Sequence, residues 1–135
     1  MAITKLSGRQ EVIAAKVTIT YDTLSSDAAV GEAVIQIPEG AIVVGGFVNV
    51  KTVFNSTTSD VLDIGDSVDD DEYTSSQVDL TALGVTALTI TGYQYTTQDN
   101  IMVEWTAGST GTATTGEADI IVQYIVDGRA AFSEG

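Results

Sequence analysis

The stretch EADIIVQYIV, residues 117–126, decides the fold of this chain. One face of it carries only apolar side chains, those of Ala118, Ile120, Val122, Tyr124 and Val126. Alternation with a period of two residues is typical of a β-strand with one face on a core. The other face carries Asp119, Ile121, Gln123 and Ile125 and is therefore partly apolar as well. The stretch is predicted to be a central strand of a sheet or to lie at an interface.

Shorter stretches with the same period lie on both sides of this strand. Their inward residues are predicted to be Val17, Ile19 and Tyr21; Ala33, Ile35 and Ile37; Val48, Val50 and Phe54; Leu62 and Ile64; Leu88 and Ile90; and Ile101, Val103 and Trp105. Segments rich in Gly, Asp, Asn and Ser separate them, as turns do. Only Thr74–Gly84 could hold a short helical turn. The pattern predicts an all-β fold, a β-sandwich or jelly roll of about eight antiparallel strands, in a single domain of residues 1–135.

The charge of the chain narrows the classes of partner. Its 135 residues carry a formal net charge of −14, with only five Lys and Arg. A nucleic-acid-binding protein needs a positive surface for phosphates, and anionic membranes repel an acidic protein too, so neither partner is expected. No apolar run approaches the roughly 20 residues that span a bilayer. The N-terminal MAITKLSGRQ lacks the pattern of a signal peptide, so we expect the chain to be assembled in the cytoplasm.

Enzyme chemistry is not expected. The chain has neither Cys nor His, which removes thiolate chemistry, the commonest general base and the commonest transition-metal ligand. A glycosidase carboxylate pair is the remaining enzyme hypothesis, but the chain has so many carboxylates that their presence indicates little. We therefore predict no catalytic, cofactor-binding or metal-binding residues and no cofactor.

The acidic stretch DIGDSVDDDEY, Asp63–Tyr73, raises a separate question. Oxygen ligands suit Ca²⁺, so cation binding by the Asp63–Glu72 loop stays open, although the spacing does not match an EF-hand loop. The favoured interpretation is that Asp63 points outward from a short strand and that Asp66–Glu72 form a solvated loop. Mutual repulsion of the carboxylates would then discourage edge-to-edge pairing of sheets.

A longer string around this stretch is distinctive. Residues 47–83, FVNVKTVFNSTTSDVLDIGDSVDDDEYTSSQVDLTAL, resemble a group of small structural proteins of tailed bacteriophages that are encoded near the major capsid protein. In that group a strand ending in TVFNS precedes a TSD turn, LDIGD, an acidic loop and a Tyr. Residues 116–129, GEADIIVQYIVDGR, resemble the closing strand of the same group. Together with the strand between them, these segments cover roughly the last two thirds of the chain.

The resemblance implies a capsid decoration, or cement, protein. Such proteins have compact β folds, often jelly rolls, and commonly form trimers at three-fold positions of an icosahedral head. They clamp neighbouring capsomers against the pressure of packaged DNA. For this chain the resemblance implies a place on the outside of the virion, the major capsid protein as partner, a homotrimer and no catalytic residues. Trimer contacts are expected first at the two-sided strand Ile120–Ile125.

Two further hypotheses concern the N-terminal segment and a different function. Residues 1–16 contain Lys5, Arg9 and Lys16 and are either an arm that contacts an acidic patch of the capsid or an ordinary first strand with solvated lysines. The alternative function is a carbohydrate- or receptor-binding β-sandwich of a phage fibre or tail. Its candidate features are Tyr93, Tyr95, Trp105 and the loop Ala107–Gly116, which is predicted to be flexible. A head–tail or tail-tube component is a third possibility.

Overall fold

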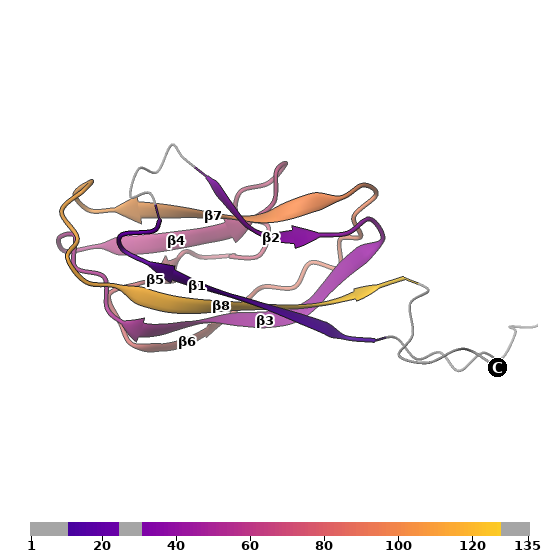
Figure 1. Cartoon of the computed structure of the whole chain (residues 1–135), viewed down its shortest axis with the longest axis horizontal. Coiled ribbons are helices and arrows are strands. Elements are labelled where there is room, and N and C mark those ends of the chain that lie inside the picture. Colours follow the sequence, from indigo (N-terminus) through magenta and orange to yellow (C-terminus); the bar gives the residue numbers. More distant parts are fainter. Residues whose placement is uncertain (1–10, 25–30, 128–135) are drawn as a thin grey trace, which may run out of the picture.

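The structure is a computed structural model that describes residues 11–24 and 31–127. In these residues all regular structure is β, and the eight strands form two layers (Figure 1). The strands are β1 (Ile13–Thr20), β2 (Glu32–Ile37), β3 (Ala41–Thr52), β4 (Asp60–Gly65), β5 (Val78–Asp79), β6 (Gly84–Ala87), β7 (Asp99–Ala107) and β8 (Glu117–Val126). No helix in the described part of the chain is long and apolar enough to cross a membrane.

The strand order identifies the topology. One sheet has the order β1-β8-β3-β6 and is called the first sheet below, and the second sheet has the order β2-β7-β4-β5. All neighbouring strands are antiparallel, and β1 pairs with β8, β2 with β7, β3 with β6 and β4 with β5. These four pairs arise when the chain folds once into a long hairpin, with its tip between β4 and β5, and the hairpin then wraps around itself. This is a jelly roll, so the predicted fold class is confirmed.

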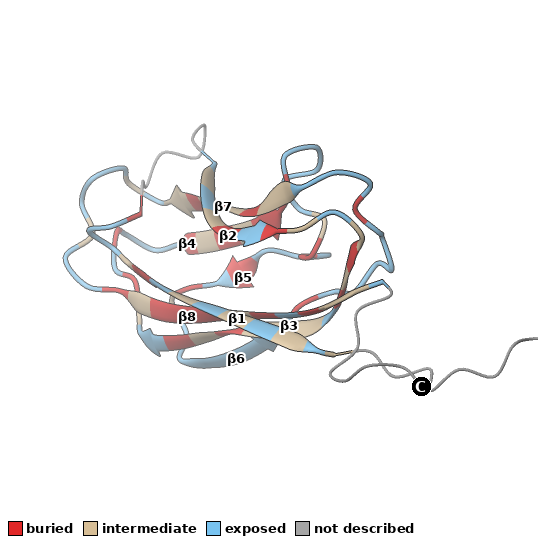
Figure 2. Ribbon diagram, turned by 45° about the vertical axis from the view of Figure 1, so that its right-hand side comes forward, coloured by how far each residue is buried: buried red, intermediate tan, exposed pale blue. Residues whose placement is uncertain are grey.

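The core lies between the two sheets and consists of the side chains that the period of two predicts. Figure 2 shows buried residues on the strands of both layers. Leu62, Ile64, Ile101 and Ile120 have no exposed surface at all, and Trp105 is only 1% exposed. The strand β8 lies between β1 and β3, so its prediction as a central strand is confirmed.

Two inward predictions fail at strand ends and irregularities. The register of β2 against β7 shifts between Ala33 and Ile35, so Val34 is an extra residue that packs against the core. A β-bulge of this kind reverses the phase of the side chains before it. Ala33, predicted to point inward with Ile35, is therefore exposed. Tyr21 lies after the end of β1 and is exposed as well.

The segment between β5 and β7 departs most from the prediction. The sequence pattern predicts that Leu88 and Ile90 point inward from one strand, but the strand β6 ends at Ala87 and Ile90 is 42% exposed. Leu88 alone is buried, and its backbone N–H donates to the carbonyl of Gly46. The region Thr74–Gly84 holds no helical turn; it contains β5 and the start of β6.

Candidate functional site

The carboxylates in the acidic stretch and just before it are divided into buried and exposed ones. Asp60, at the start of β4, has no exposed surface and accepts three hydrogen bonds. The donors are the Ser56 backbone N–H at 3.0 Å, the Ser56 hydroxyl at 2.6 Å and the Trp105 indole N–H at 2.9 Å. Buried polar groups are stable when they are paired in this way. Asp60 therefore fixes the turn before β4 to the neighbouring strand β7.

Asp66 is also buried, which corrects the prediction that all of Asp66–Glu72 is solvated. Its side chain is 6% exposed and accepts hydrogen bonds from the backbone N–H groups of Val68 and Asp69 and from the Tyr95 hydroxyl at 2.9 Å. The hydroxyls of Tyr95 and Tyr73 lie 2.6 Å apart. Burial raises the pKa of Tyr73 to about 12, and burial followed by the hydrogen bond with Tyr73 raises that of Tyr95. Both tyrosines stay protonated near neutral pH and join the acidic loop to the segment before β7.

The exposed part of the stretch is the run Asp69–Asp71. One carboxylate oxygen of each of the three residues lies within 4.8 Å of the others, and all three residues are exposed. The hydrogen bond and the negative charge of Asp69 raise the pKa of Asp71. For these three residues the predicted solvated loop is confirmed. Their carboxylates repel one another and keep this end of the second sheet strongly negative.

A pair of like charges lies on the outer face of the second sheet. Asp63 on β4 and Glu104 on β7 are directly opposite each other in the antiparallel register. The Asp63 carboxylate accepts hydrogen bonds from Thr74 and from Gln77. Burial, followed by the charges of Asp70 and Asp63, raises the pKa of Glu104. Like charges directly opposite each other destabilise a sheet, so the pair of Asp63 and Glu104 lowers the stability of the second sheet.

Neutralising one member of this pair should stabilise the fold. A folded-state pKa of Glu104 above its usual 4.5 means that the folded chain binds the proton more tightly than the unfolded chain. Protonation of Glu104 therefore raises the free energy of unfolding as the pH falls through the raised pKa toward 4.5. As the pH rises through the same range, this contribution is lost. The Glu104→Gln variant is expected to be more stable than the parent chain at pH 7 by about 0.2–1 kcal/mol at low ionic strength.

Thermal unfolding of both proteins at pH 7 and near pH 5 checks this expectation. The gap between the two melting temperatures should narrow at the lower pH and at high salt, because protonation and screening both weaken the repulsion. Glu39→Gln, at an exposed residue in the turn after β2, is the control. A Glu104→Gln variant that melts below its parent at pH 7 would contradict the argument.

The aromatic residues do not form a common surface. Trp105 is 1% and Tyr95 2% exposed, whereas Tyr93 is 44% exposed. Trp105 packs edge-to-face on Phe54 with the ring centroids 5.1 Å apart, and Tyr93 packs in the same way on Tyr95 at 5.0 Å. A sugar-stacking platform needs exposed ring faces. Of the three rings, only Tyr93 is exposed enough to offer one.

The loop Ala107–Gly116, which is predicted to be flexible, is hydrogen-bonded to the turn before β4. The Asn55 side-chain oxygen accepts from the N–H groups of Thr114 and Thr115, at 2.8 and 3.0 Å, and its amide nitrogen donates to the Thr114 hydroxyl. Nearer the start of the loop, the Gly108 N–H donates to the Ser56 hydroxyl. An Asn side chain that pairs with backbone groups in this way replaces a missing strand partner.

Removal of this side chain should release the loop. In Asn55→Ala two backbone N–H groups lose their acceptor, and we expect a loss of about 1–2 kcal/mol in unfolding free energy. Hydrogen exchange of residues 112–116 should accelerate more than that of β8. Thr58→Ala, at an exposed position of the same turn, is the control. Unchanged exchange in the loop of Asn55→Ala would contradict this role.

On the outer face of the first sheet, apolar side chains lie next to one another on neighbouring strands. The register places Phe47 of β3 between Ile121 of β8 and Ala87 of β6, and Ile42 opposite Ile125. None of these side chains is fully buried. The sequence could have predicted the outward position of Phe47. Val48 and Val50 point into the core, so alternation along β3 places Phe47 on the outer face. The two-sided character of β8 at Ile121 and Ile125 is thereby confirmed.

The same face also carries the two lysines of the described residues. Lys16 lies 3.6 Å from Asp119, and Lys51 lies 3.4 Å from Asp119 and 3.7 Å from Glu117. The hydrogen bond from Thr18, followed by these lysines, lowers the pKa of Asp119. Opposite charges therefore balance one another here. Lys16 belongs to β1, whereas Lys5 and Arg9 of the expected N-terminal arm lie outside the described residues.

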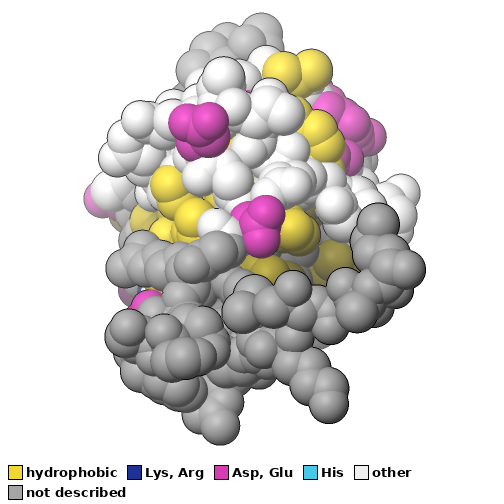
Figure 3. Space-filling model, turned by 90° about the vertical axis from the view of Figure 1, so that its right-hand side faces the viewer, with side chains coloured by type: hydrophobic (Ala, Val, Ile, Leu, Met, Phe, Trp, Pro, Cys, Tyr) yellow, Lys and Arg dark blue, Asp and Glu magenta, His cyan; other side chains and the backbone are white. Residues whose placement is uncertain are grey.

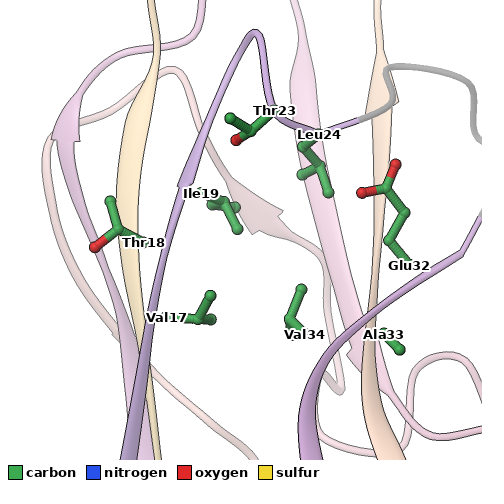
Figure 4. Close-up of a pocket in the computed structure, with 8 residues that line it drawn as sticks. All are labelled: Val17, Thr18, Ile19, Thr23, Leu24, Glu32, Ala33 and Val34. Atoms are coloured by element: carbon green, nitrogen blue, oxygen red, sulfur yellow. The ribbon is translucent and has the colours of Figure 1, made fainter.

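Two hollows lie at the margins of the sandwich. In the first, of about 250 Å³, Val17 and Ile19 of β1 face Leu24 and Val34 across the open side between the sheets, whereas Thr18 and Ala33 turn away (Figure 4). The second, of about 290 Å³, is lined by Gln36, Pro38, Glu39 and Gln98. Figure 3 shows acidic side chains standing apart among hydrophobic and uncharged ones at one end of the molecule. The first hollow is lined mostly by apolar residues, whereas three of the four residues that line the second are polar.

Comparison with known proteins places the fold. No protein-family model matches the sequence, and no curated protein matches it either. Three solved chains are similar over nearly their whole length. A chain of the cyanophage Pam1 capsid asymmetric unit has a TM-score of 0.63 and 20% identity and covers 93% of this chain, which covers 92% of it.

The other two similar chains come from further phage capsids. One is in the acidic stable capsid structure of Helicobacter pylori bacteriophage KHP30, with a TM-score of 0.61 and 12% identity, covering 93% of this chain and 98% of its own. The other is in the capsid of Ralstonia phage GP4, with a TM-score of 0.50 and 17% identity. The match covers 96% of this chain and 93% of the phage GP4 chain. This jelly roll is thus a fold that occurs in phage capsid structures.

Proposed function

We propose that this chain is a structural protein of a tailed bacteriophage head that decorates the outside of the capsid and stabilises it. The observation that carries the proposal is the match of the complete jelly roll to chains in three phage capsid structures, over 93–96% of its length. The residues 47–83 and 116–129 support it through their resemblance to small phage structural proteins. As a decoration protein the chain binds the major capsid protein and clamps adjacent capsomers, as a homotrimer.

The side chains of the described residues suit this role. The buried carboxylates Asp60 and Asp66 are occupied by structural hydrogen bonds and hold loops to strands. These bonds tie the loops to the strands, which suits a protein that clamps capsomers. Copies bound at many lattice points also gain avidity, because each copy contacts more than one neighbour at once.

Binding to heads tests the proposal. Heads of the phage that encodes the chain, prepared without this protein, are mixed with purified protein, sedimented and imaged. We expect the protein to sediment with the heads, to appear on their outer surface at regular lattice positions, and to raise the temperature at which packaged DNA is released. Decorated and undecorated heads with the same release temperature would remove the stabilising role, and an absence of binding would remove the proposal.

The N-terminal segment is a separate part of the proposal. We infer that residues 1–10, with Lys5 and Arg9, contribute to the contact with an acidic patch of the capsid. A variant without residues 1–10 should bind heads more weakly, and the difference should shrink as salt is raised. Binding of this variant at full strength would leave residues 1–10 without a role in attachment.

A further inference from the structure

The segment from Leu80 to Gln98 carries no charged side chain, although the chain as a whole has a net charge of −14. It is bounded by Asp79 and Asp99. We call it the charge-free segment. In a chain with so many carboxylates, an uncharged stretch of this length is a distinct surface if it is exposed.

The structure places the charge-free segment along the free edge of β3. Its strand β6 pairs with residues 47–50 of β3. Leu88 then donates its N–H to Gly46 at 3.1 Å, Gln94 bridges to Ile42, and Tyr95 donates its N–H to Ala41 at 2.9 Å. The charge-free segment therefore runs along one edge of the first sheet. In the described part of the chain, β6 is the last strand at that edge.

The charge-free segment is exposed and partly apolar. Of its 19 residues only Leu80, Leu88 and Tyr95 are buried. Leu83 is 68%, Val85 65%, Ile90 42% and Tyr93 44% exposed, and these are half of the large exposed hydrophobic residues in the described part of the chain. In Figure 2 the strand β6 is coloured as exposed. Several exposed large apolar side chains on one segment are typical of a contact with another protein.

The surface continues onto the outer face of the first sheet. Val85 lies opposite Asn49, and Ala87 lies opposite Phe47, which is in turn opposite Ile121. The exposed bulge residue Val44 of β3 lies close by in the same sheet. Fifteen residues of the charge-free segment are exposed. Together with these neighbours, they come close to the number of residues on one side of a stable protein interface, which is about 20.

We propose that copies of this chain bind one another through the charge-free segment. The charge distribution selects a second copy as the occupant. The described residues include 17 of the 19 acidic residues but only Lys16 and Lys51 of the basic ones, so two copies repel each other over most of their surfaces. Through the charge-free segment they meet without opposed carboxylates and bury apolar side chains. This inference deepens the proposed function, of which self-association is one part.

The second sheet offers no comparable surface. Its outer face carries the opposed carboxylates Asp63 and Glu104, and the exposed run Asp69–Asp71 adjoins it. Two such faces would bring five carboxylates of each copy together. In the first sheet Asp119 lies opposite Asn49, which also lies opposite Val85, but Asp119 and Glu117 are both paired with lysines.

A charge introduced into the charge-free segment tests the proposal. Val85→Glu places a carboxylate at an exposed outward position, and Val68→Glu makes the same change at a residue that is 90% exposed in the acidic loop. Light scattering and sedimentation velocity measure the mass of the parent chain and both variants, and circular dichroism checks that each is folded. We expect the parent and Val68→Glu to be multimeric, and Val85→Glu to associate at least about a hundredfold more weakly, because an unpaired carboxylate is buried. High salt should not dissociate the parent chain.

Single cysteines give an independent measurement, since the chain has none of its own. In Val85→Cys the thiol should react with a maleimide about tenfold more slowly at high than at low protein concentration. The thiol of Val68→Cys should react at the same rate at both. A parent chain that is monomeric up to high micromolar concentration would overturn the proposal. So would unprotected Val85→Cys, or a folded Val85→Glu with the mass of the parent.

Failure of this inference is distinguishable from failure of the proposed function. A chain that is monomeric in solution but binds undecorated heads keeps the function and loses the self-association. A chain that is multimeric through the charge-free segment but does not bind heads loses the function and keeps the inference. The head-binding measurement with Val85→Glu separates these two outcomes.

Discussion

Asp60→Ala is expected to lower the free energy of unfolding by about 3–5 kcal/mol, the largest effect of a single side chain outside the apolar core. Asp60 accepts hydrogen bonds from two groups of Ser56 and from the indole of Trp105, and it has no exposed surface. Removing the carboxylate leaves these donors buried with no acceptor. Asp60 has no exposed surface and Ser56 is only 5% exposed, so water has little access to replace the carboxylate.

Chemical denaturation of Asp60→Ala and of Asp70→Ala measures this effect. Asp70 belongs to the same acidic sequence but is exposed, so its removal should change stability by less than about 0.5 kcal/mol. The indole fluorescence of Trp105, the single Trp of the chain, reports the transition directly. Asp60→Asn keeps the shape of the side chain but directs an amide N–H at one of the donors, and it should be nearly as damaging. Equal stability of Asp60→Ala and Asp70→Ala would show that the hydrogen bonds of Asp60 contribute nothing.

Gly46→Ala is expected to be almost as destabilising, by about 2–4 kcal/mol. Gly46 has a φ of +143°, which side-chain-bearing residues rarely adopt, and a Cβ at this position would overlap the backbone carbonyl of Ile121 and the Leu88 side chain. Backbone on one side and a buried leucine on the other cannot both give way. Because Leu88 fixes the charge-free segment to β3, the variant should also loosen that segment.

The neighbouring glycine is a matched control. A Cβ at Gly45 would meet only the end of the flexible Gln123 side chain, and its φ lies outside the strained region. Gly45→Ala should therefore cost less than about 1 kcal/mol. Denaturation and hydrogen exchange of residues 84–95 compare the two variants. If Gly45→Ala proves the more damaging, the close approach at Gly46 is not what constrains the sheet.

Sequence periodicity predicts most of this fold for a physical reason. A strand covered by a core on one face has to alternate, and β7, β4 and most of β3 do so, while β8 has an apolar residue at every inward position although its outer face carries Ile121 and Ile125 as well. The inward residues Leu62, Ile64 and Ile120 were therefore identifiable. The jelly roll itself was one of two architectures that the strand number allowed, and the pairing of β1 with β8 selects it.

The failures lie where contacts distant in sequence override local pattern. The bulge at Val34 reverses the phase of β2, and Ile90 alternates correctly but lies beyond the end of β6, where the segment is no longer a regular strand. Asp60 and Asp66 look like other aspartates in the sequence. Their burial depends on Trp105 and Tyr95, donors from distant segments that local composition does not reveal.

The candidate surface was predictable only in part. The two-sided pattern of β8 pointed to Ile121 and Ile125, which do lie on the outer face of the first sheet. The exposure of Leu83 and Val85 could not be predicted, because the sequence of their segment is typical of turns and a buried strand. Their exposure follows from the position of β6 at the end of its sheet, which is a property of the topology.

The wrapped hairpin has a consequence for how the chain is made. Thr18 of β1 and Asp119 of β8 are bonded side by side although they are 101 residues apart in the chain. The first sheet therefore cannot close until β8 has been synthesised and has left the ribosome. Folds with contacts this distant in sequence form slowly, in milliseconds to seconds. During that interval the growing chain exposes unpaired strands, and its strong negative charge keeps nascent copies on one messenger from sticking together.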